Sequence, residues 1–467
     1  MGMRPCSRET SQEVRCGGTP RPARETRALP DGVCLARMIA MLASPEARSH
    51  APREAQAQWA QTPIGERLRV IRRLRHLIAE HAEELALASA QVSDRPLAEK
   101  LASEVLPLAD ACRWLERRAA KLLAPRQVGS RGRPFWMSGI SSAVQRQPFG
   151  LVLVIGPGNY PLFLPAVQTL HALVAGNAVL LKPAPETRHV AVAFAALAFA
   201  VGLDRALLTV LPESVSSGAN AIAAGVDKVV FTGSSENGRE VLVLLAESNT
   251  PAAMELSGED AVLVLADADL DLVTRALRFG ARLNAGNTCM APRRLIVVEA
   301  IAEELLRRLR ATEHCQQTET LCSAIERVRD ESAGVAAINA GEFALGASIF
   351  SRDSAGAQIL AARIRTGFVL INDLIIPTAD PRLPFGGVKA SGFGTTRGEE
   401  GLLEMTHPQV VSVSSGKARR HFDEPEEGDA GLFAAYLRAA HGRRQLAAIP
   451  ELLRALFHKA RNRTKNV

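Results

Sequence analysis

Short apolar segments alternate with helical stretches through the middle of the chain, and this alternation constrains the fold more than any other feature. The segments are 151–155 (LVLVI), 178–181 (AVLL), 207–211 (LLTVL) and 228–231 (KVVF). A strand that is buried on both faces reads as a continuous apolar run, and strands separated by helices pair in parallel. The pattern therefore predicts a parallel sheet with helices on both faces.

A second series of the same kind begins at 261–265 (AVLVL) and continues with 295–298, 348–350 and 368–372. Two α/β domains are therefore expected, and a chain of 467 residues is long enough to bury both cores. Before the first series, residues 44–123 carry a helical pattern of apolar positions.

Composition excludes several classes of protein. With 47% apolar and 22% charged residues, the chain has the balance of a globular protein and not of a disordered one. The longest apolar run, 190–203, is shorter than the ~18 residues of a membrane span and reads as a buried helix. Aromatic residues make up only 4%, too few for a base-stacking surface, so no nucleic-acid partner is expected.

The cysteine pattern indicates the cellular location, and composition and charge indicate the character of the two terminal segments. The seven cysteines are scattered without a C-x-x-C pair, which indicates reduced thiols, a cytoplasmic location and no metal site. Residues 1–43 are expected to be poorly ordered. Residues 416–467 carry 11 basic and 6 acidic residues, and within them 432–461 reads as one or two amphipathic helices in a solvated basic tail.

Two glycine-rich turns join a predicted strand to a predicted helix. The first, 156–161 (GPGNYP), matches G-x-G-x-x-G poorly because Pro161 replaces the third glycine and because the next strand ends in Lys182 where an acidic residue is required. Lys182 either donates to a ribose or a 2′-phosphate, or only marks the sheet edge. The second turn, 231–239 (FTGSSENGR), either holds a pyrophosphate with its backbone N–H groups or is an ordinary turn.

Cys289 and Glu255 are the candidate reactive groups. Cys289 lies among small and polar residues in 284–292 (NAGNTCMAP), a setting that lets a thiol approach a carbonyl carbon. As a nucleophile it needs surroundings that favour the thiolate; the alternative is a small core residue. Glu255 lies between Met254 and Leu256, so burial is expected to raise its pKa into the range of a general base; the alternative is a glutamate at a strand end.

Taken together, these residues resemble the aldehyde dehydrogenases over about 55–413. The resemblance implies an α/β fold with a Rossmann-like parallel-sheet cofactor domain, an α/β catalytic domain and a β-hairpin oligomerisation arm. It places the cofactor domain at 44–126 and 148–256, the catalytic domain at 257–407 and the arm at 127–147 and 408–415. It also implies a homodimer or homotetramer. The motifs that carry it are 158–161 (GNYP), 182–183 (KP), 231–234 (FTGS), 255–256 (EL), 286–289 (GNTC), 384–387 (PFGG) and 389–392 (KASG).

The resemblance further implies NAD- or NADP-dependent oxidation of a small-molecule aldehyde to a carboxylic acid. Cys289 would form a thiohemiacetal and then a thioester, Asn159 would help to hold the oxyanion, and Glu255 would activate the hydrolytic water. The residues expected to bind the cofactor are Lys182, Pro185, Gly233, Ser234, Gly238 and Leu256.

The chain also departs from the family pattern. The Glu-x-Phe-Gly-Pro motif that holds the nicotinamide ribose is missing, and the interval between Cys289 and Gly346 is several dozen residues short. Pro185 stands where an acidic residue is usual, which removes a repulsion against a 2′-phosphate and favours NADP at least as much as NAD. Two rival functions stay open: a cofactor-independent (thio)esterase using the same Cys289 and Glu255, and a non-catalytic protein with this fold.

Overall fold

The computed structural model describes residue 35 and residues 52–89, 95–134, 137–311, 325–415, 420–426 and 428–463. Except for Leu35, the expectation about residues 1–43 lies outside this part. The chain divides into two compact units. The body comprises residues 1–124 and 146–408, and the arm-and-tail unit comprises residues 125–145 and 409–467.

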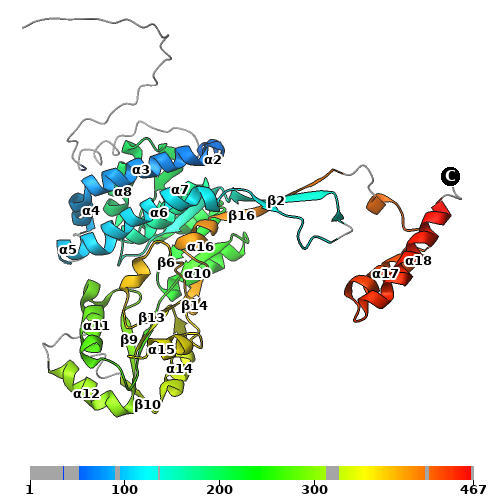
Figure 1. Cartoon of the computed structure of the whole chain (residues 1–467). Helices are drawn as coiled ribbons and strands as arrows, with labels where there is room; N and C mark the ends of the chain where they lie inside the picture. Colours follow the sequence, from blue (N-terminus) through cyan, green and yellow to red (C-terminus); the bar gives the residue numbers. More distant parts are fainter. Residues whose placement is uncertain are drawn as a thin grey trace, which may run out of the picture. The chain divides into compact units, whose positions relative to one another are not determined.

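The body contains a layer of helices in residues 52–89 and 95–122, as predicted for the described part of 44–123 (Figure 1). Amphipathic α3 buries Val70, Ile71, Leu74 and Ile78. The elements of this layer are α2 (Pro52–Gln61), α3 (Ile64–Glu80), α4 (Ala82–Ala88), α5 (Leu97–Lys100), a π-helical turn (Leu101–Val105) and α6 (Leu106–Leu122).

The first sheet has six strands in the order β15-β7-β6-β3-β4-β5. All neighbours pair in parallel except β15, which is antiparallel to β7. The strands are β3 (Leu151–Ile155), β4 (Ala178–Lys182), β5 (Leu208–Val210), β6 (Lys228–Thr232), β7 (Ala252–Glu255) and β15 (Gly392–Phe393). The connecting helices are α7 (Phe163–Ala175), α8 (Arg188–Ala200), α9 (Val215–Ala223) and α10 (Ser235–Ala246). The four strands predicted for this sheet, β3 to β6, are confirmed; β7 and β15 are additional.

The second sheet is parallel throughout, in the order β10-β9-β8-β12-β13. Its strands are β8 (Asp260–Val264), β9 (Pro292–Val298), β10 (Ile325–Val328), β12 (Gly346–Phe350) and β13 (Phe368–Ile371). Alternate residues enter different cores: Val262 and Leu295 pack with α11 (Leu270–Arg282) and α12 (Glu299–Arg310), whereas Leu263 and Ile296 pack with α14 (Glu331–Ala340) and α15 (Ser354–Ala361). Helices therefore cover both faces of this sheet (Figure 1).

Short elements complete the body. These are 3₁₀ turns at Arg205–Leu207, Leu283–Gly286 and Ile376–Ala379, the pair β11 (Phe343–Ala344) and β14 (Val388–Lys389), and α16 (Gly398–Leu403). None of the helices within the described ranges is long and apolar enough to cross a membrane.

The arm-and-tail unit contains the predicted hairpin. Strands β1 (Arg126–Val128) and β2 (Ile140–Pro148) pair antiparallel, and β16 (Thr406–Ser414) completes a three-stranded sheet in the order β1-β2-β16. After a 3₁₀ turn (Arg420–Phe422), the tail forms α17 (Asp429–His441) and α18 (Gln445–Arg463). Arg438 pairs with Glu451, and Lys459 pairs with Asp429, which ties the two helices together.

Candidate active site

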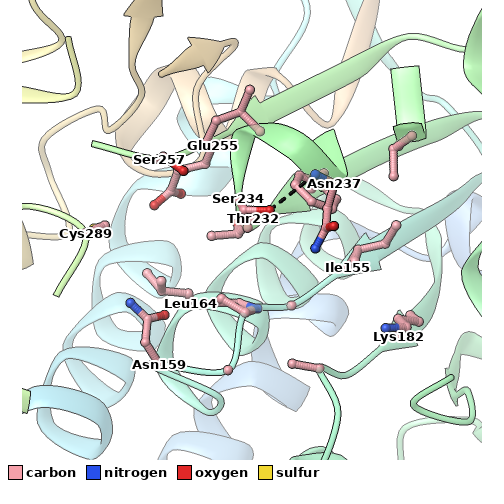
Figure 2. A pocket seen from close by; sticks show the side chains of 18 of the residues that line it. Ile155, Asn159, Leu164, Lys182, Thr232, Ser234, Asn237, Glu255, Ser257 and Cys289 are labelled. Atoms are coloured by element: carbon pink, nitrogen blue, oxygen red, sulfur yellow. Dashed lines mark hydrogen bonds between the residues drawn. The ribbon is translucent and has the colours of Figure 1, made fainter. Parts of the chain in front are cut away.

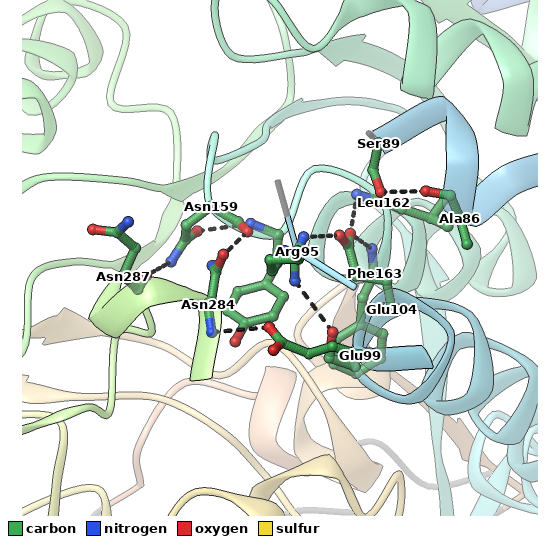
Figure 3. Close-up of polar contacts among 12 residues, drawn as sticks. Ala86, Ser89, Arg95, Glu99, Glu104, Asn159, Leu162, Phe163, Asn284 and Asn287 are labelled. Carbon is green, nitrogen blue, oxygen red and sulfur yellow. Dashed lines mark hydrogen bonds and ion pairs between the residues drawn. The ribbon is translucent and has the colours of Figure 1, made fainter. Parts of the chain in front are cut away.

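A buried carboxylate, that of Glu104, binds the backbone where the turn after β3 meets α7. Glu104, on the π-helical turn, accepts hydrogen bonds at Oε2 from the backbone N–H groups of Leu162 (2.8 Å) and Phe163 (3.3 Å), at the start of α7 (Figure 3). Its Oε1 pairs with Arg95 Nη2 at 2.5 Å. Since unpaired N–H groups at a helix start need acceptors, Glu104 fixes where the turn ends and α7 begins.

The same layer orients Tyr160. The Arg95 guanidinium lies 5.2 Å from the centre of the Tyr160 ring. The Tyr160 hydroxyl and the Thr288 hydroxyl form a hydrogen bond of 2.7 Å, so the first turn contacts the residue directly before Cys289.

Two further hydrogen bonds join the turn to the loop that carries Cys289 (Figure 3). Asn159 Nδ2 donates to the carbonyl oxygen of Asn287 (2.7 Å), and Asn284 Nδ2 donates to the carbonyl oxygen of Asn159 (2.9 Å). Asn284 and Ala285 have positive φ values of 50° and 51°, a conformation that costs free energy for residues other than glycine. The cross-links hold the Cys289 loop in this strained form.

Cys289 is half-buried, and its surroundings favour the protonated form of the thiol. Burial raises the pKa of the thiol, and the carboxylates of Glu255 and Asp260 raise it further. The Arg397 guanidinium and a hydrogen bond from the backbone N–H of Met290 act in the opposite direction. A nucleophilic role predicted surroundings that favour the thiolate. This prediction is wrong for the free protein, because desolvation and two carboxylates outweigh one cation and keep the group a thiol.

Glu255 ends β7 and is 2% exposed. As expected from its apolar neighbours, burial raises the pKa of its carboxyl, while Arg397 and a hydrogen bond from Thr396 lower it. Thr396 Oγ1 donates to Oε2 at 3.2 Å. Oε1 is buried and has no hydrogen-bond partner among the described residues, so it is free to accept a proton.

Two cavities meet at these groups. The larger, about 800 Å³, runs along the carboxyl edge of the first sheet, with Lys182 and Cys289 at opposite ends (Figure 2). The smaller, about 430 Å³, lies beyond Cys289 and is mainly apolar, with Phe163, Phe279 and Ile376 in its walls. Four residues line both cavities: Leu164, Glu255, Thr288 and Cys289.

Five of the six residues predicted to bind a cofactor line the larger cavity: Lys182, Pro185, Gly233, Ser234 and Leu256. Ser234 Oγ caps α10 by accepting from the backbone N–H of Asn237 at 3.2 Å, so the helix start faces the cavity (Figure 2). Gly238 is the exception, because it does not line the cavity. A Cβ there would lie 2.5 Å from Leu256 Cδ2, so Gly238 acts by leaving space for that side chain.

Three relevant residues escaped the sequence analysis. Glu213 follows β5, next to β4 in the sheet. Burial lowers the pKa of Lys182, and the Glu213 carboxylate offsets part of this lowering. Adjacent parallel strands bring their carboxyl ends together, and this rule could have identified Glu213. Thr396 and Arg397 had no comparable signal, since they reach Glu255 from more than 140 residues away in sequence.

The fold and the site together define an α/β protein with a cysteine and a buried glutamate at the junction of two cavities. Residues 43–320 and 322–411 match the model of the aldehyde dehydrogenase family, and the chain belongs to this family. The family and the fold class expected from the motifs are thereby confirmed.

Individual relatives cover most of the chain. A 4,4′-diapolycopene aldehyde oxidase from Methylomonas sp. is 29% identical over 431 residues, which cover 79% of this chain and 81% of the relative. A putative NADP⁺ succinate-semialdehyde dehydrogenase from Mycobacterium ulcerans is 30% identical over 435 residues, which cover 78% of this chain and 83% of the relative. In fold, the chain is similar to a putative aldehyde dehydrogenase from Burkholderia cenocepacia, with a TM-score of 0.72, 24% identity, and coverage of 84% and 91% of the two chains.

Proposed function

We propose that the protein oxidises an aldehyde to a carboxylic acid with NAD or NADP, through a thiohemiacetal and then a thioester on Cys289. One observation carries the proposal: Cys289 and Glu255 line both cavities. A reaction between two bound molecules requires its reacting groups where the two binding sites meet. We also propose the domain boundaries and the oligomerisation role of the arm given by the resemblance.

The larger cavity has the chemistry that a dinucleotide needs. Lys182 can bind a ribose or a 2′-phosphate at one end, and the capped start of α10 with Gly233 and Ser234 suits a pyrophosphate. When bound, the nicotinamide supplies the acceptor for the hydride that leaves the substrate carbon. The Glu-x-Phe-Gly-Pro motif that would hold the nicotinamide ribose is missing from the sequence. Part of the shortened interval where it would lie, 312–324, is outside the described residues.

The chain's own groups perform the remaining steps. Glu255 Oε1 takes the thiol proton, and Sγ attacks the carbonyl carbon, whose π electrons move to oxygen. One hydrogen of Asn159 Nδ2 is engaged by Asn287, which leaves the other for this oxyanion, together with the backbone N–H of Cys289. After the thioester forms, Glu255 releases the first proton to solvent and takes a second one from water, whose oxygen adds to the carbonyl carbon. The C–S bond then breaks, the acid leaves, and Glu255 returns its proton to the departing thiolate.

The lining of the smaller cavity favours an aldehyde with an apolar body. Its walls include Phe163, Phe279, Leu283 and Met290. This agrees with the relative named for diapolycopene aldehyde. Two cations, Arg282 and Arg397, also line the cavity, so an aldehyde with a carboxylate, as in the name of the succinate-semialdehyde relative, is the competing substrate.

The decisive experiment is a single-turnover measurement at 340 nm with NAD or NADP, using a straight-chain apolar aldehyde and succinic semialdehyde. We expect nucleotide reduction with the apolar aldehyde that vanishes in Cys289→Ala. Hydrolysis of an activated ester by the wild type, lost in Cys289→Ala and without any nucleotide reduction, would favour the esterase alternative. A folded protein with neither reaction would leave the non-catalytic alternative.

A further inference from the structure

Arg397 is a buried arginine that forms no ion pair with any described residue of the body. It directly precedes α16 and is 5% exposed, and its guanidinium lies 4.0 Å from the ring centre of Phe385 and 5.5 Å from that of Phe163. Nη1 donates to the carbonyl oxygen of Thr378 (2.6 Å), while Nε is buried without a hydrogen-bond partner among the described residues. A buried cation without a carboxylate in contact is costly, so its place requires a reason.

The reason lies in the cavity that Arg397 shares with the reacting groups. Arg397, Glu255 and Cys289 all line the smaller cavity. Arg397 attracts the charged forms of both groups, yet it forms neither a hydrogen bond nor an ion pair of 4.0 Å or less with Glu255. Glu255 Oε1 and Arg397 Nε are both buried without a hydrogen-bond partner among the described residues, so each retains an unused hydrogen-bonding position.

The local chain explains how this arrangement is held. Thr396 donates to Glu255 Oε2, and its backbone N–H donates to the carbonyl oxygen of Phe385 (2.9 Å). The next residue, Arg397, stacks on the ring of the same Phe385. The Thr396 side chain therefore fixes the Glu255 carboxylate, and the next residue, Arg397, supplies a cation.

We propose that Arg397 is a positioning residue for the reaction, the buried counter-cation that keeps Glu255 ionised and supports the Cys289 thiolate. The proposal rests on the proposed function, in which both groups must carry negative charge inside a buried site. In an apolar cavity a single positive charge within reach acts strongly, because little water screens it. Contact with Glu255 would instead block Oε1 as a base, and the observed separation avoids this.

Other titratable groups face the same pair. Asp260 on β8 raises the pKa of the Cys289 thiol and opposes Arg397. His171 on α7 faces Arg397; burial first, and then Arg397, lower its pKa to about 4, so His171 stays neutral at assay pH. Asp260, whose pKa burial raises to about 7, can only gain negative charge as pH rises. Neither Asp260 nor His171 can therefore supply the positive charge of Arg397 between pH 6 and 9.

The first test measures the thiol without substrate or cofactor. The rate of iodoacetamide alkylation at Cys289, followed by peptide mass spectrometry at pH 8, reports its thiolate fraction. We expect Arg397→Met to lower this rate about 5- to 10-fold, as a rise of about one unit in the thiol pKa requires, and Arg397→Lys to stay within about 2-fold of the wild type.

Two controls separate charge from folding. Cys112 is fully buried in the same body, so its alkylation in a variant reports opening of the structure. Arg282→Met removes another cation from the lining of the same cavity, but an exposed one, and should change Cys289 alkylation less than about 2-fold because water screens it.

The second test measures Glu255 through the pH dependence of thioester hydrolysis after single-turnover acylation. Loss of the cation raises the pKa of Glu255, so the acid limb of the rate should move to higher pH by at least about one unit in Arg397→Met, and far less in Arg397→Lys. If acylation fails in the wild type, the proposed function fails while the alkylation result still decides the role of Arg397.

Three outcomes would overturn the proposal. Wild-type alkylation in Arg397→Met with Cys112 protected would reduce Arg397 to a packing residue between two rings. An unmoved acid limb would separate it from Glu255. If Cys112 becomes reactive in Arg397→Met, Arg397→Lys is the deciding variant, since it keeps the charge but loses the stacked guanidinium plane. An equal loss of Cys289 alkylation in both variants would contradict the counter-cation role. Preserved Cys289 alkylation in Arg397→Lys would support it.

Discussion

The two cavities that meet at Cys289 are built in different ways. The larger is formed by strand-to-helix turns along one edge of the first sheet, so backbone and glycine positions determine its shape. The smaller is formed by side chains from α5, α7, α11 and the segment after β13, which are distant in sequence. A cavity made from turns suits a ligand common to many proteins, whereas a cavity made from side chains can be altered by substitution without disturbing the sheet.

The largest effect is expected at the junction, with Asn159→Ala. If the proposed function holds, loss of one oxyanion donor should lower kcat about 10²- to 10³-fold, or ~2.7–4 kcal/mol, with little change in KM for either ligand. Asn159 Nδ2 also donates to Asn287 in the Cys289 loop, so a thermal melt must accompany the kinetics. A large rise in KM with unchanged kcat would mean that Asn159 shapes a binding site and not the transition state.

A buried carboxyl group that acts on Cys289, that of Asp260, should affect stability through pH. Burial raises the pKa of Asp260 to about 7 in the folded protein, above its value in the unfolded chain. Between about pH 4 and pH 7 the unfolded state therefore loses its proton first, so Asp260 makes the fold less stable as pH rises. Asp260→Asn should raise the free energy of unfolding at pH 8 by up to about 4 kcal/mol, and by little at pH 4.

Urea denaturation of both proteins at the two pH values provides the measurement. Asn keeps an acceptor for the backbone N–H of Gly346, which Asp260 binds at 3.1 Å, so this hydrogen bond is matched in the variant. An equal change at both pH values would show that packing, and not ionisation, distinguishes the two side chains.

The same contrast explains what the sequence could predict. Strands β3, β4, β6 and β8 were predictable because strands buried on both faces are uniformly apolar. Lys182 and Ser234 were noticed because each stands at the end of such a strand or in the turn after it. Glu255 was noticed by its apolar neighbours, since its own strand β7 was not predicted. Arg397 and Thr396 were not predictable, since only the antiparallel pairing of β15 with β7 brings their segment to Glu255.

Ala102→Phe tests the side-chain cavity alone. Ala102 lines the smaller cavity from the π-helical turn, and a phenyl ring there would take space from an apolar substrate. We expect KM for a long straight-chain aldehyde to rise about 10-fold and that for acetaldehyde to change less, because one apolar contact region is worth about 1–3 kcal/mol. Equal rises for both aldehydes would place the substrate elsewhere.

Lys182→Met tests the turn-built cavity alone. Loss of a hydrogen bond from a charged donor should weaken NAD or NADP binding about 10-fold, by roughly 1.5 kcal/mol or more. Alkylation of Cys289 without cofactor should stay unchanged, because Lys182 lies at the opposite end of the cavity (Figure 2). Calorimetric titration measures the affinity, and unchanged binding in the variant would reduce Lys182 to a residue of the sheet edge.

The smallest effect concerns the choice between NAD and NADP. Pro185 stands where an acidic residue is usual, so one negative charge near Lys182 is missing. The carboxylate of Glu213 still lies close enough to offset part of the lowering of the Lys182 pKa by burial, and this negative charge opposes a 2′-phosphate. Glu213→Gln keeps an acceptor for the backbone N–H of Arg188, which Glu213 Oε2 binds at 3.4 Å, and removes only the charge. We expect the ratio of NADP to NAD affinity to rise about 3-fold at low salt and less at 0.3 M salt, because exposed charges are screened. If the ratio does not change at low salt, Pro185 and Lys182 remain as the residues that set the preference. If the wild type binds NAD more than about tenfold tighter than NADP, a proline in place of the usual acidic residue does not favour NADP.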